Sequence, residues 1–212
     1  MRYKKKSEIF FILCLLVLFV YTLNSCGSFS DPQKLILDLN SHLITLGIEE
    51  LPEIEYRTTE YLIYYDGSLN TIFIPSYNEL ETEQMNFIDK YVSGEENFIE
   101  LFNWFFIAHE YGHVYQFNNS QFEMSPFQIE SEANRFAIQF LIDHDIERLI
   151  GLRDVLLLLK QNPLLGELAT DEAYFNSNYL QIPIKSPELY LLYQIEMILY
   201  HVENGLNVDG AI

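Results

Sequence analysis

The chain has 212 residues, nearly half of them apolar, a composition that suits one compact domain and excludes a disordered chain. Its formal net charge of −19 argues against nucleic acid as a partner. Four of the 12 basic residues lie within residues 2–6, and residues 26–212 hold 8 basic and 30 acidic residues, a net charge of −22.

The N-terminus has the pattern of an export signal. Residues 2–6 are basic, and residues 9–23 are apolar but shorter than the ~20 residues that a membrane-spanning helix needs. Leu23-Asn24-Ser25-Cys26 follows, and it resembles the lipobox of bacterial lipoprotein signal peptides. The resemblance implies a signal peptide over residues 1–25, a lipid on Cys26 and attachment to a membrane of the bacterial cell envelope, outside the cytoplasm. The alternatives are an uncleaved anchor helix and a plain secretory signal.

The mature chain, residues 26–212, predicts an α+β domain with a small antiparallel sheet before a mostly helical C-terminal half. Tyr61–Tyr65 and Thr71–Ile74 are expected to form a hairpin, and an earlier strand is plausible near Ile54–Arg57. Apolar spacing, caps and Pro/Gly signals indicate helices over residues 32–46, 78–92, 98–117, 127–143, 145–160 and 187–204.

Residues 109–113 read His-Glu-Tyr-Gly-His, within the helix expected over 98–117. Positions i and i+4 share a helix face, so His109 and His113 can converge on one metal ion. Imidazole suits Zn²⁺, which in catalytic sites keeps one position for water. Glu110 lies one step further round the helix, where it can act as general base rather than ligand. Gly112 is expected to allow a neighbouring backbone to approach closely.

A second motif follows in Glu130-Ser131-Glu132-Ala133-Asn134. Together with His-Glu-x-x-His, it resembles the gluzincin metallopeptidases, including membrane-associated and neutral zinc peptidases of bacteria. The resemblance covers about residues 105–140. It implies a zincin-like fold, Glu130 as the third zinc ligand and Asn134 at the position of an aspartate that supports a ligand histidine. Glu132 is the rival ligand, but it lies about 200° from Glu130 round a helix, on a face without the small residues.

Asn134 departs from the usual aspartate of that family. Its amide oxygen can still accept a hydrogen bond from a histidine ring, but it carries no charge. Loss of a supporting carboxylate typically costs about 10–100-fold in metal affinity or activity, so Asn134 is expected to weaken the site.

The sequence does not determine which residues stabilise the oxyanion or contact the substrate. An oxyanion-stabilising group is expected among the later aromatic residues, without a choice between them: Tyr174, Tyr179, Tyr190, Tyr200 and His201. Thr71–Ile74 is the candidate strand for pairing with an extended substrate.

Two functions are consistent with these patterns. The first is a membrane-tethered peptidase that holds one Zn²⁺ per chain, hydrolyses peptide bonds in peptides or proteins, and uses Glu110 as general base and then acid. The second is a zincin-fold lipoprotein that works only by binding or assembly. Loss of Glu110 or of a ligand would mark the second function, and neither loss is seen.

Overall fold

The computed structural model describes residues 32–92, 104–119, 123–166 and 168–208. The signal peptide predicted over residues 1–25 and Cys26 lie outside these residues, as does the start of the helix expected over 98–117. The chain divides into two compact units, Met1–Leu35 and Ile36–Ile212, and the fold below is that of the second unit. Within the described residues, no helix is both long and apolar enough to cross a membrane.

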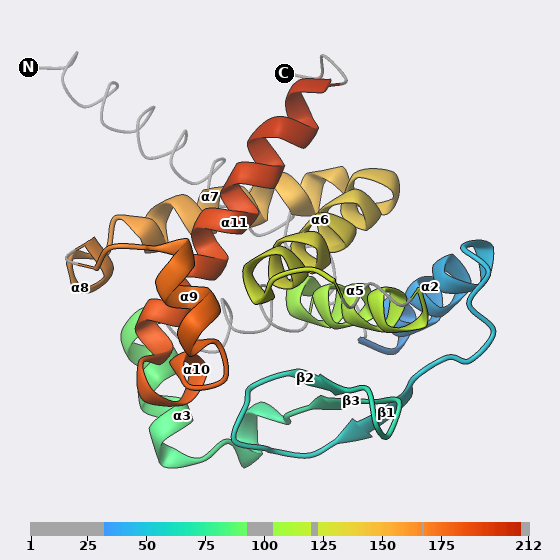
Figure 1. The fold of residues 1–212 in the computed structure, drawn as a ribbon, viewed down its shortest axis with the longest axis horizontal. Coiled ribbons are helices and arrows are strands. Elements are labelled where there is room, and N and C mark those ends of the chain that lie inside the picture. Colours follow the sequence, from blue (N-terminus) through green and yellow to red (C-terminus); the bar gives the residue numbers. More distant parts are fainter. Residues whose placement is uncertain (1–31, 93–103, 120–122, 167, 209–212) are drawn as a thin grey trace, which may run out of the picture. The chain divides into compact units, whose positions relative to one another are not determined.

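The fold is mixed α+β and mostly helical, with one small sheet (Figure 1). The three strands are β1 (Glu53–Tyr56), β2 (Tyr64–Asp66) and β3 (Thr71–Ile74). The described helices are α2 (Pro32–Thr45), α3 (Thr82–Phe87), α5 (Ile107–Asn118), α6 (Pro126–His144), α7 (Ile146–Lys160), α8 (Pro163–Gly166), α9 (Glu172–Asn178), α10 (Ile182–Lys185) and α11 (Pro187–Val208), with a 3-10 turn at Tyr77–Glu79 and a π-helical turn at Ile88–Val92.

The strand order is β1-β3-β2. β2 and β3 pair antiparallel, as predicted for the hairpin, but β1 pairs parallel with β3. The prediction of an antiparallel sheet is therefore wrong for β1. The reason is that the chain after β1 does not turn back at once through residues 57–63 to form a strand next to β1. The position next to β1 is taken by β3, which runs parallel to β1 and antiparallel to β2.

Because β3 is the central strand, its two edges are both paired. The prediction that Thr71–Ile74 offers an edge to an extended substrate is therefore wrong. All four residues of β3 are buried, which suits a strand in the middle of a sheet. β2 is an edge strand, and it is the strand that contacts α5.

Local signals explain where the two central helices begin. Ser125 caps α6 in a capping box with Gln128, and Pro126 occupies the first turn, where its missing N–H costs nothing. Asp145 caps α7 by accepting a hydrogen bond from the Arg148 N–H. These starts agree with the sequence prediction.

The C-terminal half differs from the prediction in two places. α11 does not end at Asn204-Gly205 but continues to Val208, because Gly205 keeps a right-handed helical backbone and lies against Ile142 of α6. Residues 163–185, for which no helix is predicted, form the short helices α8, α9 and α10.

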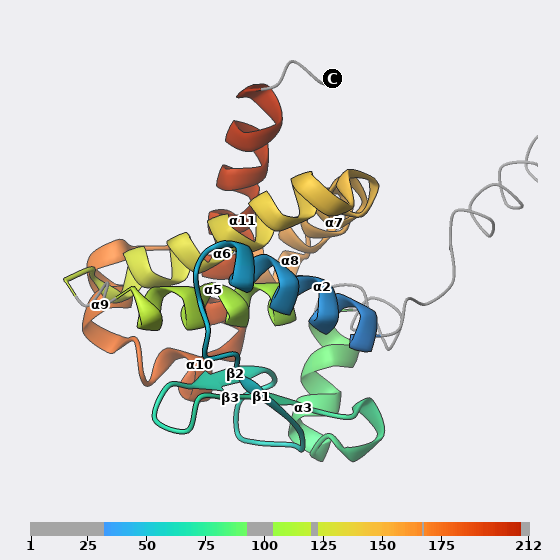
Figure 2. The same ribbon diagram turned by 90° about the vertical axis from the view of Figure 1, so that its right-hand side faces the viewer.

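The order in which the sheet and helices are stacked determines which elements surround the site. Figures 1 and 2 show α5 between the sheet and α6, and α6 in turn packs against α11. One face of α5 therefore meets β2 and another meets α6, so residues on α5 can act together with groups from both neighbours.

Candidate metal centre

The two histidines of the motif lie four residues apart on α5, with both rings directed to one place. Their Nε2 atoms are 3.1 Å apart. Each Nδ1 has its own acceptor: Asn134 Oδ1 at 2.9 Å for His109, and Gln116 Oε1 at 3.0 Å for His113. A ring whose Nδ1–H donates in this way keeps the lone pair of Nε2 free for a metal ion.

Glu130 of α6 faces both Nε2 atoms. Its carboxylate oxygens lie 3.3 Å from His109 Nε2 and 3.6 Å from His113 Nε2. Three atoms that bind one zinc ion tetrahedrally, with bonds of about 2.0–2.1 Å, lie ~3.3–3.4 Å from one another. The two Nε2 atoms are 3.1 Å apart, and Glu130 presents Oε2 to His109 at 3.3 Å and Oε1 to His113 at 3.6 Å, so the residues present are close enough together to hold a small divalent cation.

Close contact between α5 and α6 makes this convergence possible. A Cβ added at Gly112 would lie 2.8 Å from the Cα of Ala133, nearer than atoms can pack. Gly112 and Ala133 are therefore the point where the two helices touch, one residue from His113 and three from Glu130. The predicted role of Gly112 as a place of close backbone approach is confirmed.

Three further donors hold Glu130, all from the C-terminal half of the chain. Its Oε1 accepts from the Tyr179 hydroxyl at 2.6 Å, and its Oε2 accepts from the Tyr190 hydroxyl at 3.0 Å and from Gln194 Nε2 at 2.7 Å. Glu130 is almost completely buried, so these hydrogen bonds take the place of the water that its charge has lost. They also fix the direction of the carboxylate.

The buried carboxylate of Glu130 and the two histidines shift one another's pKa values. Burial acts to raise the pKa of Glu130, but the hydrogen bond with His109 and the charges of both histidines hold it far below its usual range. Burial acts to lower the pKa of His109, but the hydrogen bond and charge of Glu130 outweigh it and raise that pKa. Burial lowers the pKa of His113. A positive charge beside Glu130 is therefore favourable, and a bound cation would supply it.

Glu110 approaches the histidines from the opposite side to Glu130. A carboxylate oxygen of Glu110 and a ring nitrogen of each histidine lie within 4.8 Å of one another. Its Oε2 accepts a hydrogen bond of 2.8 Å from the Tyr65 N–H of β2. Burial raises the pKa of Glu110 to about 8. Glu130 lies closer than Glu110 to both histidines.

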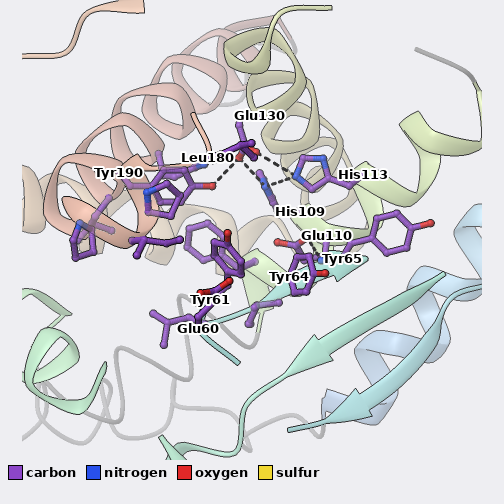
Figure 3. Close-up of a pocket in the computed structure, with 18 of the residues that line it drawn as sticks. Glu60, Tyr61, Tyr64, Tyr65, His109, Glu110, His113, Glu130, Leu180 and Tyr190 are labelled. Atoms are coloured by element: carbon purple, nitrogen blue, oxygen red, sulfur yellow. Dashed lines mark hydrogen bonds and ion pairs between the residues drawn. The ribbon is translucent and has the colours of Figure 1, made fainter. Parts of the chain in front are cut away.

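The centre opens into a cavity of about 740 Å³. Figure 3 shows residues that line this cavity, with Glu130 and the two histidines at the top, Tyr61 and Glu60 at the bottom, and Tyr190 and Leu180 to one side. Of the candidate oxyanion groups, Tyr179 and Tyr190 line the cavity. The walls come from β2 and the loop before it, from α3, α5 and α6, and from the C-terminal segment.

Glu132, the rival ligand, points elsewhere. Its carboxylate pairs with the exposed guanidinium of Arg135. This agrees with the helix-face argument that separates Glu130 from Glu132.

Several contributors to the centre were not predicted from the sequence. Gln116 has a usable signal, because it follows His113 by three residues on the same helix. Gln194, which joins Asn134 and Glu130, has none, because its place depends on how α11 packs against α6.

Comparison of the chain with protein-family models, curated proteins and solved structures finds no match. What the molecule itself establishes is a mixed α+β fold with a buried His-Glu-x-x-His cluster, His109, Glu110 and His113, that can hold one metal ion.

Proposed function

We propose that this chain is a zinc-dependent peptidase of the gluzincin type. The observation that carries the proposal is the convergence of His109, His113 and Glu130 on one point, with the carboxyl of Glu110 beside it and a cavity in front of it. Two imidazoles and one carboxylate are the protein ligand set of several catalytic zinc sites. When bound, the zinc ion would acidify water and polarise a carbonyl group.

Glu110 supplies the proton transfer. Burial raises the pKa of Glu110, which favours the uptake of a proton from water and its later transfer to a leaving amine. Its hydrogen bond from the Tyr65 N–H keeps one oxygen on β2 and leaves the other for water at the centre. Amide hydrolysis needs this sequence, in which the base that accepts the proton from water returns it to the departing nitrogen.

The edge strand β2 is suited to hold an extended substrate. It lies along the cavity, and its side away from β3 carries no other strand of the described sheet. A peptide bound beside β2 would bring its scissile bond past Glu110, which already accepts a hydrogen bond from the Tyr65 N–H on that edge. We therefore propose β2, and not β3, as the strand beside which a substrate binds.

The decisive experiment compares the wild-type chain with Glu110→Gln, both loaded with zinc, against a broad peptide library read by mass spectrometry. Removal of a general acid–base group typically costs about 10²–10⁴-fold in rate. We expect Glu110→Gln to keep its zinc and lose cleavage, and a chelator to stop cleavage by the wild type until zinc is restored. If neither protein gives any product, the binding-only alternative replaces this proposal, and equal cleavage by both would remove Glu110 from its role.

A further inference from the structure

The cavity in front of the metal centre is mainly apolar. Aromatic and aliphatic side chains line it, from the loop before β2, from α5 and the residue before it, and from the C-terminal segment, including Ile63, Phe106, Phe117, Leu180, Ile184 and Leu191. Leu180 and Ile184 keep 74% and 52% of their surface exposed, an unusual position for residues of their type. A ligand that covered them would gain free energy by removing apolar surface from water.

The charged residues that line the same cavity are all acidic. They are Glu60, Glu81, Glu83, Glu110 and Glu130, and no lysine or arginine is among the described residues of the lining. Glu110 and Glu130 belong to the metal centre, where a bound cation would offset their charge. Glu81 caps α3. Glu60 and Glu83 are exposed and form no ion pair with a described residue, so their charges face the ligand and solvent.

We infer that the substrate is a cationic, apolar peptide segment, in which a large apolar side chain near the scissile bond fills the cavity and a neighbouring lysine or arginine faces Glu60 and Glu83. This inference rests on the proposed peptidase function and names its substrate class. Burial of apolar surface in the cavity supplies the affinity. Glu60 and Glu83, which form the acidic rim of the cavity, favour a ligand of positive charge. The net charge of −22 over residues 26–212 acts in the same direction, since it raises the local concentration of cationic ligands.

Other occupants of an apolar cavity fit less well. A fatty acid or another anionic amphiphile would bring its negative charge to Glu60, Glu81 and Glu83, the acidic side chains at the mouth among the described lining residues. A neutral apolar peptide would contact the apolar walls of the cavity but would form no ion pair with Glu60 or Glu83. Each therefore becomes a comparison ligand in the test.

The test measures binding apart from cleavage. Zinc-loaded Glu110→Gln is titrated with four fluorescent peptides of equal length: leucine with lysine, leucine with glutamate, leucine with glutamine, and serine with lysine. We expect the leucine–lysine peptide to bind about three- to tenfold more tightly than the leucine–glutamine peptide, and at least about tenfold more tightly than the leucine–glutamate and serine–lysine peptides. Its advantage over the leucine–glutamate peptide should fall as salt is raised, because the rim charges are exposed.

Matched variants assign the effect to the cavity. Glu60→Gln with Glu83→Gln should weaken the leucine–lysine peptide about three- to tenfold, as expected for two exposed ion pairs, while Glu79→Gln, an exposed glutamate outside the cavity, should change nothing. Leu180→Ser with Ile184→Ser should weaken all leucine peptides, while Leu158→Ser, equally exposed but outside the cavity, should not.

The outcomes separate this inference from the proposed function. Equal binding of the leucine–lysine and leucine–glutamate peptides, or no effect of the Glu60 and Glu83 changes, would overturn the substrate class. Cleavage of both peptides by the wild type at equal rates would overturn it as well, while leaving the peptidase intact. Selective binding without any cleavage by the wild type would instead overturn the peptidase and keep the ligand class.

Discussion

Asn134 and Gln194, on α6 and α11, share a buried hydrogen bond of 2.8 Å from the Asn134 amide to the Gln194 oxygen. The Gln194 amide continues to Glu130, and the Asn134 oxygen faces His109 Nδ1. Glu130 and His109 are thus joined through the side-chain amides of Gln194 and Asn134. Gln194 uses both ends of its amide, so its orientation is determined by its two neighbours.

Replacement of Gln194 by leucine should therefore disturb the centre. It removes one donor from Glu130 and leaves the Asn134 amide without its acceptor, each a loss of about 1–3 kcal/mol for a buried group. We expect a lower free energy of unfolding and weaker zinc binding, measured by denaturant titration and by competition with a chelator. Gln139→Leu, on the exposed side of α6, is the control and should match the wild type.

The same pair predicts that Asn134→Asp does not improve the centre, although a carboxylate there would resemble the gluzincin pattern. An aspartate has no amide to offer Gln194, and a Gln194 turned to donate to the new carboxylate would set its own oxygen against Glu130. We expect Asn134→Asp to bind zinc no more tightly than the wild type. Tighter binding by that variant would show that Gln194 adapts freely.

Glu130→Gln should lose zinc, whereas Glu132→Gln should keep it. Glu130 faces both histidines, and glutamine offers the ion one neutral oxygen instead of a carboxylate. Glu132 is engaged with Arg135 on the outer side of α6. Elemental analysis of the purified variants should find about one zinc per chain in the wild type and in Glu132→Gln. The reverse result would exchange the roles of the two glutamates.

Gly112→Ala should push α5 and α6 apart. The new Cβ meets the backbone of Ala133, which cannot turn aside as a side chain can. Alanine is about 1 kcal/mol better than glycine in a helix, but overpacking costs about 1–3 kcal/mol or more, so the net effect should be destabilising, with loss of zinc affinity. Gly151→Ala in α7 is the matched control, because nothing lies within 4 Å of its added Cβ, and it should stabilise the protein slightly.

Glu110 should make the metal-free protein less stable as the pH rises. Its folded pKa of about 8 lies above the ordinary value of 4.5, so the folded state holds a proton that the unfolded state releases between these values. Its contribution to stability is complete below pH 4.5 and is lost as pH rises to about 8. In a chelator, Glu110→Gln should lose roughly 3 kcal/mol less than the wild type between about pH 5 and 8, as measured by denaturant unfolding. Parallel curves for the two proteins would contradict this.

Lipid attachment at Cys26 remains a prediction of the sequence. Cells fed an alkyne fatty acid should label the wild-type protein, and Cys26→Ser should abolish the label. An unlabelled wild-type chain that still carries residues 1–25 would favour an uncleaved anchor.

The sequence was most informative where contacts are local. His109, Glu110 and His113 lie on one helix, so their arrangement follows from the helical repeat. The starts of α6 and α7 follow from caps a few residues away. The position of Glu130 opposite the histidines depended on a resemblance and on the small residues of its face, both readable in one short stretch.

Prediction was weakest where distant segments meet. The partner of β1 is set by a crossover, which no turn signal encodes. Tyr179, Tyr190 and Gln194 reach Glu130 only because α9 and α11 fold back across α6. The sequence offers fifteen tyrosines and no periodicity that selects two of them.

These two kinds of contact also differ in the length of chain that must be closed to make them. His109 reaches Asn134 across 25 residues, whereas Tyr179, Tyr190 and Gln194 reach Glu130 across 49, 60 and 64. Shorter loops cost less entropy to close, so α5 and α6 can meet, and bring the two histidines to Glu130, before α11 returns. A cation present at that moment would act as a folding nucleus. Zinc should then accelerate refolding, and not merely slow unfolding.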